Sequence, residues 1–94
     1  MQFEEPSSQG YTIYSKSGCP NCVIAKKQAA ETKSNETAPK IIECDEYLLE
    51  SRPEFLSFIR EKIQQPDETK KLYFPFIFKD GHYIGSKLLF LVFC

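Results

Sequence analysis

The chain has 94 residues, of which 41% are apolar and 14% aromatic, and its formal net charge is −1. This length predicts one domain, and the apolar content is typical of a globular protein rather than a disordered one. The basic residues are spread along the chain without a basic tract, which argues against a nucleic-acid partner.

The ends of the chain suggest a location. Residues 1–10 are polar and acidic, without the apolar core of a signal peptide, so we expect a flexible leader followed by a single domain over 11–94. The longest apolar run, Leu88 to Cys94, is far too short to span a membrane. Four cysteines without an export signal indicate a reducing compartment and catalytic rather than structural sulfur. We therefore expect a cytoplasmic location. We also expect a monomer.

Predicted strands and helices alternate along the chain. In chain order the pattern predicts a strand over 11–14, a helix from about Pro20 to Lys33, a strand over 41–44, a helix from Arg52 to Gln65, strands over 73–78 and 82–84, and a helix over 87–94. Ser51 is a candidate N-cap for the second helix, and Pro66 should end it. Lys79-Asp80-Gly81 indicates a hairpin turn.

The order β-α-β-α-β-β-α predicts an α/β fold. The first βαβ unit implies a parallel strand pair, and the hairpin adds an antiparallel pair. We therefore expect a four-stranded mixed sheet flanked by helices.

A Cys-x-x-Cys motif joins the first predicted strand to the first predicted helix. Cys19 is expected at the helix start, where backbone N–H groups and the positive end of the helix dipole favour the nucleophilic thiolate. Lys16 adds a positive charge nearby. Cys22 falls in the first turn, close enough to attack a mixed disulfide on Cys19. The motif therefore predicts a dithiol redox site, with Lys16 stabilising the thiolate.

Other interpretations of the cysteines remain open. A CxxC pair can supply half of a zinc site, but the remaining candidate ligands, Cys44, His82 and Cys94, are scattered. A structural disulfide would belong in an oxidising compartment. Cys44 is expected to be a buried small residue, and Cys94 either an idle thiol or a partner in an intermolecular or glutathione disulfide. We expect no catalytic role for His82.

Pro75 lies inside the apolar run from Tyr73 to Phe78. Proline removes a hydrogen-bond donor, so its presence in a strand interior needs a reason. One explanation is a cis peptide at the strand entry, which would place the backbone of Phe74 beside the CxxC and let it pair with an extended peptide-like substrate. The other is an ordinary edge strand.

Over residues 11–93 the chain resembles the glutaredoxin family. The matching segments are Ile13-Tyr-Ser-Lys-Ser-Gly-Cys-Pro-Asn-Cys22, Phe74-Pro-Phe-Ile-Phe78 and Asp80-Gly-His-Tyr-Ile-Gly85. The resemblance implies a thioredoxin-like fold, a cis Pro75, and a glutathione-dependent oxidoreductase that reduces protein disulfides and glutathione mixed disulfides through Cys19 and Cys22. It implies glutathione as co-substrate, no metal, and a binding groove made by Lys16, Lys71, the backbone of Phe74, Pro75, Gly85, Ser86 and Lys87.

The chain departs from the family at the end of this groove. The family usually reads Gly-Gly-x-Asp, whose acid holds the γ-glutamyl ammonium, whereas this chain reads Gly85-Ser86-Lys87-Leu88. Backbone N–H groups of Ser86 and Lys87 could still hold the γ-glutamyl carboxylate. The ammonium has no acidic partner, so we expect weaker glutathione binding.

This departure keeps two further hypotheses open. The first is a glutaredoxin-like electron donor recycled by thioredoxin reductase, as in donors to ribonucleotide reductase. The second, of another class, is a module whose thiols bind zinc or an iron–sulfur cluster. Pro20 disfavours the cluster, because cluster-binding relatives usually carry a small residue at that position.

Overall fold

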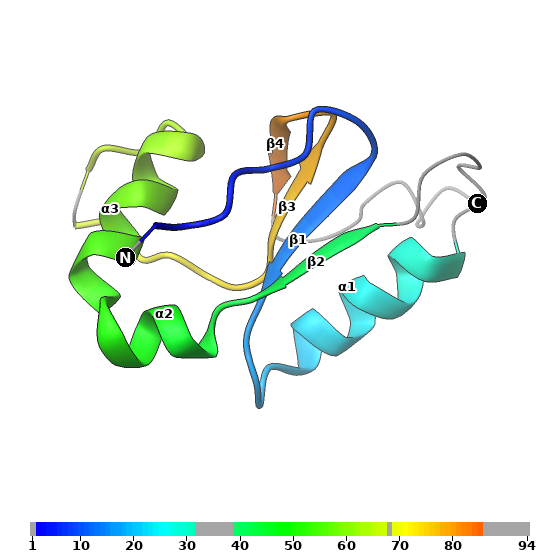
Figure 1. Ribbon diagram of the computed structural model, residues 1–94, viewed down its shortest axis with the longest axis horizontal. Helices are drawn as coiled ribbons and strands as arrows, with labels where there is room; N and C mark the ends of the chain where they lie inside the picture. The colour runs from blue at the N-terminus through cyan, green and yellow to red at the C-terminus, as the bar shows by residue number, and fades with distance from the viewer. Residues whose placement is uncertain (1, 32–38, 68, 86–94) are drawn as a thin grey trace.

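The computed structural model describes residues 2–31, 39–67 and 69–85, which form a mixed α/β fold with a four-stranded sheet (Figure 1). The elements in this part of the chain are β1 (Tyr11–Ser15), α1 (Pro20–Glu31), β2 (Lys40–Glu43), α2 (Asp45–Glu50), α3 (Arg52–Lys62), β3 (Phe76–Lys79) and β4 (His82–Gly85). The predicted C-terminal helix over 87–94 and the last two residues of the predicted first helix lie outside the described residues.

The sheet has the strand order β2-β1-β3-β4. β1 pairs in parallel with β2 and antiparallel with β3, and β3 pairs antiparallel with β4. The register sets Tyr14 opposite Phe76, so the chain leaves β1 at the same end of the sheet at which it enters β3. This topology brings the CxxC loop and the segment around Pro75 together. It also makes β3 an interior strand, so the alternative of an edge strand was wrong.

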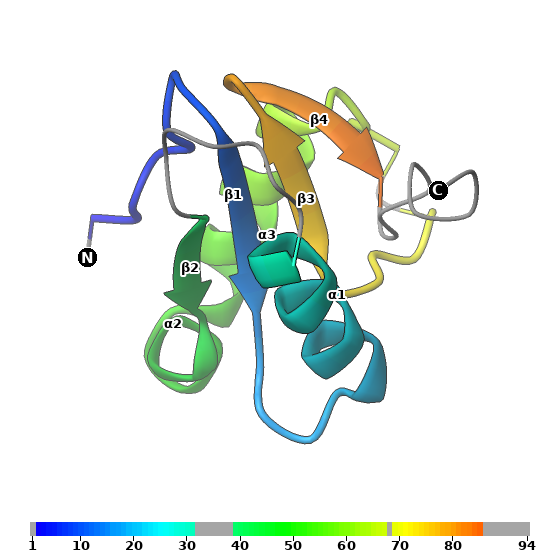
Figure 2. The ribbon, with the colours of Figure 1, turned by 90° about the vertical axis from the view of Figure 1, so that its right-hand side faces the viewer.

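Helices cover both faces of the sheet (Figure 2). On one face, Ile13 and Ile77 pack with two alanines of α1, Ala25 and Ala29, whose small side chains let the helix approach the strands closely. On the other face, a larger and strongly aromatic core gathers under α2 and α3. Its buried members are Tyr14, Ile42, Cys44, Leu48, Phe55, Ile59, Phe76 and Phe78. The period-two alternation of β1 therefore divides its side chains between two cores.

The predicted second helix differs from the observed structure at both ends. A separate short helix, α2, precedes it, and Ser51 stands between α2 and α3 without a side-chain capping hydrogen bond. At the other end, Gln64 has a φ of +58°, and the N–H groups of Gln64 and Gln65 donate to the carbonyls of Glu61 and Arg60. These two bonds form a Schellman motif, which ends α3 at Lys62 rather than at Gln65.

The third strand begins at Phe76 rather than at Tyr73, so Pro75 precedes the strand and removes no donor from its ladder. The hairpin that follows confirms its prediction. Asp80 and Gly81 have φ values of +51° and +85°, the left-handed conformations that a two-residue type I′ turn requires.

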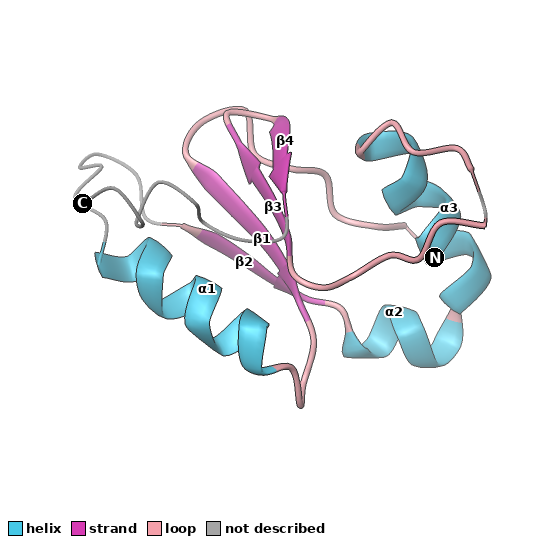
Figure 3. Cartoon of the chain, turned by 180° about the vertical axis from the view of Figure 1, so that it is seen from behind, coloured by secondary structure: helices cyan, strands magenta, loops and turns pink. Residues whose placement is uncertain are grey.

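The beginning of the N-terminal segment packs against α2 and α3, and Ser7 and Gly10 hydrogen-bond to Thr12 and Asp80, which differs from the flexible leader that the sequence predicts. The Phe3 ring centroid lies 4.9 Å from that of Tyr47 and 5.3 Å from those of Phe55 and Phe58. The buried Tyr14 hydroxyl donates to the carbonyl of Glu4 at 2.6 Å, and burial raises the pKa of Tyr14. A single aromatic residue in a polar segment thus supplies the contact that lays the N-terminal end beside α3 (Figure 3).

None of the helices in the described ranges combines the length and the apolar character needed to cross a membrane.

Candidate functional site

Cys19 occupies the N-cap position of α1. Its carbonyl accepts hydrogen bonds from the N–H groups of Cys22 and Val23 at 3.1 and 3.2 Å, and its sulfur accepts the N–H of Cys22 at 3.3 Å. Pro20, the first helical residue, has no N–H to leave unpaired. A first-turn N–H and the helix dipole are therefore both directed at the Cys19 sulfur, where they stabilise negative charge.

The three described cysteines, Cys19, Cys22 and Cys44, are free thiols with different access to solvent. Cys19 is 9% exposed, whereas Cys22 and Cys44 are fully buried. Burial, and next the hydrogen bond with Cys19, raises the pKa of the Cys22 thiol, so the resting Cys22 stays protonated. Of these three residues, Cys19 is the one that keeps some exposure to solvent.

The segment before β3 supplies backbone groups beside Cys19. The Phe74–Pro75 peptide bond is cis, and the Cys19 thiol donates to the carbonyl oxygen of Phe74 at 3.8 Å. The prediction of a cis bond that places the Phe74 backbone next to the CxxC is confirmed. Pro75 itself is buried, while the Phe74 ring is half-buried.

Asp45, the first residue of α2, anchors the loop that carries Lys16, Ser17 and Gly18. The backbone N–H and the hydroxyl of Ser17 donate to the two carboxylate oxygens of Asp45 at 2.9 and 3.0 Å. These bonds hold the pKa of Asp45 below its usual 3.8, and the bond from the backbone N–H of Ser17 has the larger effect. Gly18 follows with a φ of +71°, a conformation that strains any other residue. Sequence reasoning missed Asp45, although an acidic residue in the first turn of a helix is its signal.

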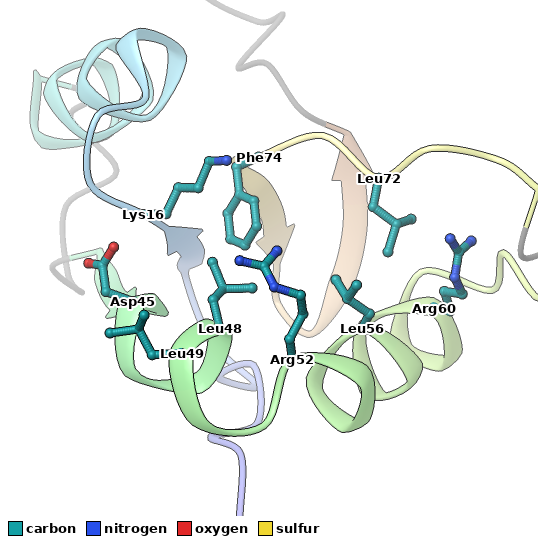
Figure 4. Close-up of a pocket in the computed structure, with 9 residues that line it drawn as sticks. All are labelled: Lys16, Asp45, Leu48, Leu49, Arg52, Leu56, Arg60, Leu72 and Phe74. Atoms are coloured by element: carbon teal, nitrogen blue, oxygen red, sulfur yellow. The ribbon is translucent and has the colours of Figure 1, made fainter.

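A pocket of about 410 Å³ opens beside this loop, between α2, α3 and the segment that leads into β3 (Figure 4). Apolar side chains of Leu48, Leu56, Leu72 and Phe74 form much of its wall, and three cationic side chains accompany them. Its full lining comprises Lys16, Asp45, Leu48, Leu49, Arg52, Leu56, Arg60, Leu72 and Phe74. Three cations against one carboxylate make the pocket suited to a small anion with apolar parts.

The three cations are held differently. Lys16 lies over the ring of Phe74, with its Nζ 5.3 Å from the ring centroid. Arg60 donates to the carbonyls of Asp67 and Lys70, both at 2.8 Å, and so supports the loop beyond α3. The exposed Arg52 extends its guanidinium between Leu48 and Leu56 in Figure 4. Sequence reasoning missed both arginines, because only the packing of α2 and α3 brings them to Lys16.

The remaining predicted groove residues are less closely associated with this pocket. Lys71 is exposed and is not among the residues that line it. Gly85 pairs with Ile77, which places Gly85 toward the end of the sheet at which β3 begins. Cys19 lies at the same end. Ser86 and Lys87 lie outside the described residues.

The other candidate metal ligands do not join the CxxC. His82 pairs with Lys79, where β3 ends, and so lies at the end of the sheet opposite to the CxxC. Burial raises the pKa of the Cys44 thiol to about 12, so that thiol is protonated at neutral pH. Cys94 lies beyond the described part. Within residues 2–31, 39–67 and 69–85, no three or more His, Cys, Asp or Glu residues gather where they could hold a metal ion.

Comparison with protein-family models, with curated proteins and with solved structures gave no match to this chain.

Proposed function

We propose that the chain is a thiol–disulfide oxidoreductase of the glutaredoxin type, with Cys19 as nucleophile and Cys22 as resolving thiol. The observation that carries this proposal is the environment of Cys19. It is the thiol with solvent access among the described cysteines, it caps a helix that directs an N–H at its sulfur, and it lies 3.8 Å from the carbonyl preceding cis Pro75. The strand order β2-β1-β3-β4, with the CxxC between β1 and α1, supports a thioredoxin-like fold.

The reaction follows from thiol–disulfide exchange. The Cys19 thiolate attacks one sulfur of a substrate disulfide, a new S–S bond forms, and the other substrate sulfur leaves as a thiolate that takes up a proton. Cys22 then attacks Cys19, which releases the second substrate thiol and leaves a Cys19–Cys22 disulfide. One glutathione thiolate would open that disulfide by bonding to Cys19. A second would release glutathione disulfide and restore the dithiol.

Substrate binding would use the backbone first. The carbonyl of Phe74 lies 3.8 Å from the reacting sulfur, and an extended peptide such as glutathione could pair with the backbone of this residue. A peptide carboxylate would enter the neighbouring cationic pocket. Lys16 and Arg52 line that pocket, so we assign the binding of this carboxylate to them rather than to Lys71, which the family resemblance placed in the groove.

A second candidate shares the fold and the cysteines but differs in its reductant. The sequence Gly85-Ser86-Lys87-Leu88 lacks the acid that would hold the ammonium of glutathione. That absence favours recycling by thioredoxin reductase, with a disulfide-bearing enzyme such as ribonucleotide reductase as the partner. The metal-binding hypothesis has no comparable observation in its favour.

Coupled assays with two reductants and two cysteine variants test the proposal. NADPH oxidation is followed with a glutathione mixed disulfide as substrate, once with glutathione and glutathione reductase and once with thioredoxin reductase. Cys19→Ser should lose all activity, whereas Cys22→Ser should still reduce glutathione mixed disulfides but not protein disulfides. Cys44→Ala is the matched control and should stay active. Activity retained in Cys19→Ser would sink the assignment, and turnover only with thioredoxin reductase would select the second candidate.

A further inference from the structure

Ser15, the last residue of β1, carries a buried hydroxyl without a hydrogen-bond partner in the described structure. The Ser15 side chain is fully buried, and its backbone carbonyl accepts a hydrogen bond from the N–H of Cys44 at 2.8 Å. Thr12 on the same strand is equally buried, but its hydroxyl oxygen accepts the N–H of Ser7 at 2.9 Å. Leaving a buried hydroxyl unpaired costs free energy, so the orphan at Ser15 needs an explanation.

The neighbour that gives this hydroxyl a purpose is Cys22. Ser15 follows Ile13 by two residues and so lies on the same face of β1, where Ile13 packs against Ala25, one helical turn beyond Cys22. The Ser15 hydroxyl makes no hydrogen bond of regular geometry in the resting state, yet together with the backbone N–H of Lys16 it lowers the pKa of the Cys22 thiol, which burial and the hydrogen bond with Cys19 raise. Two donors at the end of β1 thus act on the buried resolving sulfur. In the resting protein that sulfur is protonated and gives them little charge to stabilise.

We propose that the Ser15 hydroxyl is a hydrogen-bond donor held in reserve for the thiolate that Cys22 becomes when it resolves a mixed disulfide. In that step the Cys22 thiol gives its proton to solvent and the thiolate attacks the Cys19 sulfur. The Cys22–Cys19 bond forms, the bond from Cys19 to the substrate sulfur breaks, and the departing thiolate takes up a proton. The two thiols are oxidised and the substrate disulfide is reduced. The inference rests on the proposed function only for the order of the two cysteines.

The other groups near Cys22 cannot take over this role during the step. Cys19 is uncharged once it is part of a mixed disulfide. Cys44, from the junction of β2 and α2, stays protonated and fully buried. The Lys16 ammonium lies over the ring of Phe74, 5.3 Å from its centroid. The Lys16 N–H and the Ser15 hydroxyl are the groups that lower the pKa of Cys22, so a charge formed on its buried sulfur would be stabilised by them in addition to the α1 dipole.

The test separates the two chemical steps in single-turnover experiments with 5,5′-dithiobis(2-nitrobenzoate). In a Cys94→Ser background, attack by Cys19 releases one coloured thiolate, and attack by Cys22 on the loaded Cys19 releases the second. Ser15→Ala should slow the second release by about tenfold or more, as expected for a lost hydrogen bond to a charged group, and should leave the first unchanged. The pH profile of the second release should move to higher pH, and the free energy of unfolding should stay the same or rise.

Two further variants control for structure. Thr12→Val removes a hydroxyl of the same strand that has a partner, so it should lower stability without changing the second release. Ser15→Thr keeps the hydroxyl and should retain a fast second release. An unchanged second release in Ser15→Ala overturns the inference, as does equal slowing of both releases or a loss of stability. If Ser15→Ala slows the second release while the parent turns over no glutathione disulfide, the inference stands and the proposed function falls.

Discussion

The structure places Arg52 in the cationic pocket, whereas the family resemblance assigned Lys71 to the glutathione groove. If the cationic pocket holds a carboxylate of glutathione, Arg52→Ala should weaken glutathione use, since Arg52 lines the pocket and Lys71 does not. Arg52 is exposed, so the lost attraction is worth only ~0.4–1 kcal/mol. That value corresponds to a roughly 2- to 5-fold lower kcat/KM for glutathione, with kcat for a saturating mixed disulfide unchanged.

The assay is the glutathione-reductase-coupled assay at varied glutathione concentration, with Lys71→Ala as the matched cationic control. Lys71→Ala should stay close to wild type. The difference between wild type and Arg52→Ala should shrink when ionic strength rises from about 0.01 M to about 1 M, because the Debye length falls from ~30 to ~3 Å. A larger effect from Lys71→Ala than from Arg52→Ala, or a difference that does not respond to salt, would refute the assignment.

Three further predictions concern the fold around the site. The Cys44 thiol has its pKa raised by burial from 9.0 to about 12. Its contribution to stability is complete below pH 9 and falls as the pH rises toward 12, by about 1.4 kcal/mol between pH ~8 and ~10. Urea unfolding should show a smaller loss over that interval in Cys44→Ala, and equal losses would contradict the argument. Asp45→Ala should release Ser17 and lower kcat/KM by roughly 2- to 5-fold at pH ~7. Because the pKa of Asp45 is held below 3.8, the same factor should persist at pH ~5, and ratios that converge there would count against the anchor. Phe3→Ala should lower the free energy of unfolding by ~1.5–2.5 kcal/mol, about half the value for a fully buried phenylalanine, and a change within ~0.5 kcal/mol would show that residues 2–10 do not pack.

Features encoded in short stretches of sequence could be predicted well. The short apolar run of β1, the turn at Asp80 and Gly81, and the CxxC at a strand-to-helix junction are local signals. The cis peptide bond at Pro75 could also be predicted, because a proline inside an apolar run removes a hydrogen-bond donor and needs a structural reason. The four-stranded mixed sheet follows from the order of these elements and from the way consecutive elements connect.

Features that depend on contacts between distant residues could not be predicted. α2 spans six residues, too few for a hydrophobic period to identify, and packing of its Leu48 into the aromatic core supports it. Phe3 gave no periodic signal, yet it packs against α3. The pocket depends on α2 and α3 bringing Arg52 beside Lys16, and the orphan hydroxyl of Ser15 has no trace in the sequence.

The most direct test of the central claim is to trap and locate the first covalent intermediate. Cys22→Ser protein in a Cys94→Ser background is treated with glutathione disulfide, digested, and analysed by peptide mass spectrometry. The proposed order predicts one glutathione on Cys19 and none on the buried Cys44. An unmodified Cys19, or a glutathione adduct that forms on Cys22 in Cys19→Ser as fast as on Cys19 in Cys22→Ser, would contradict it.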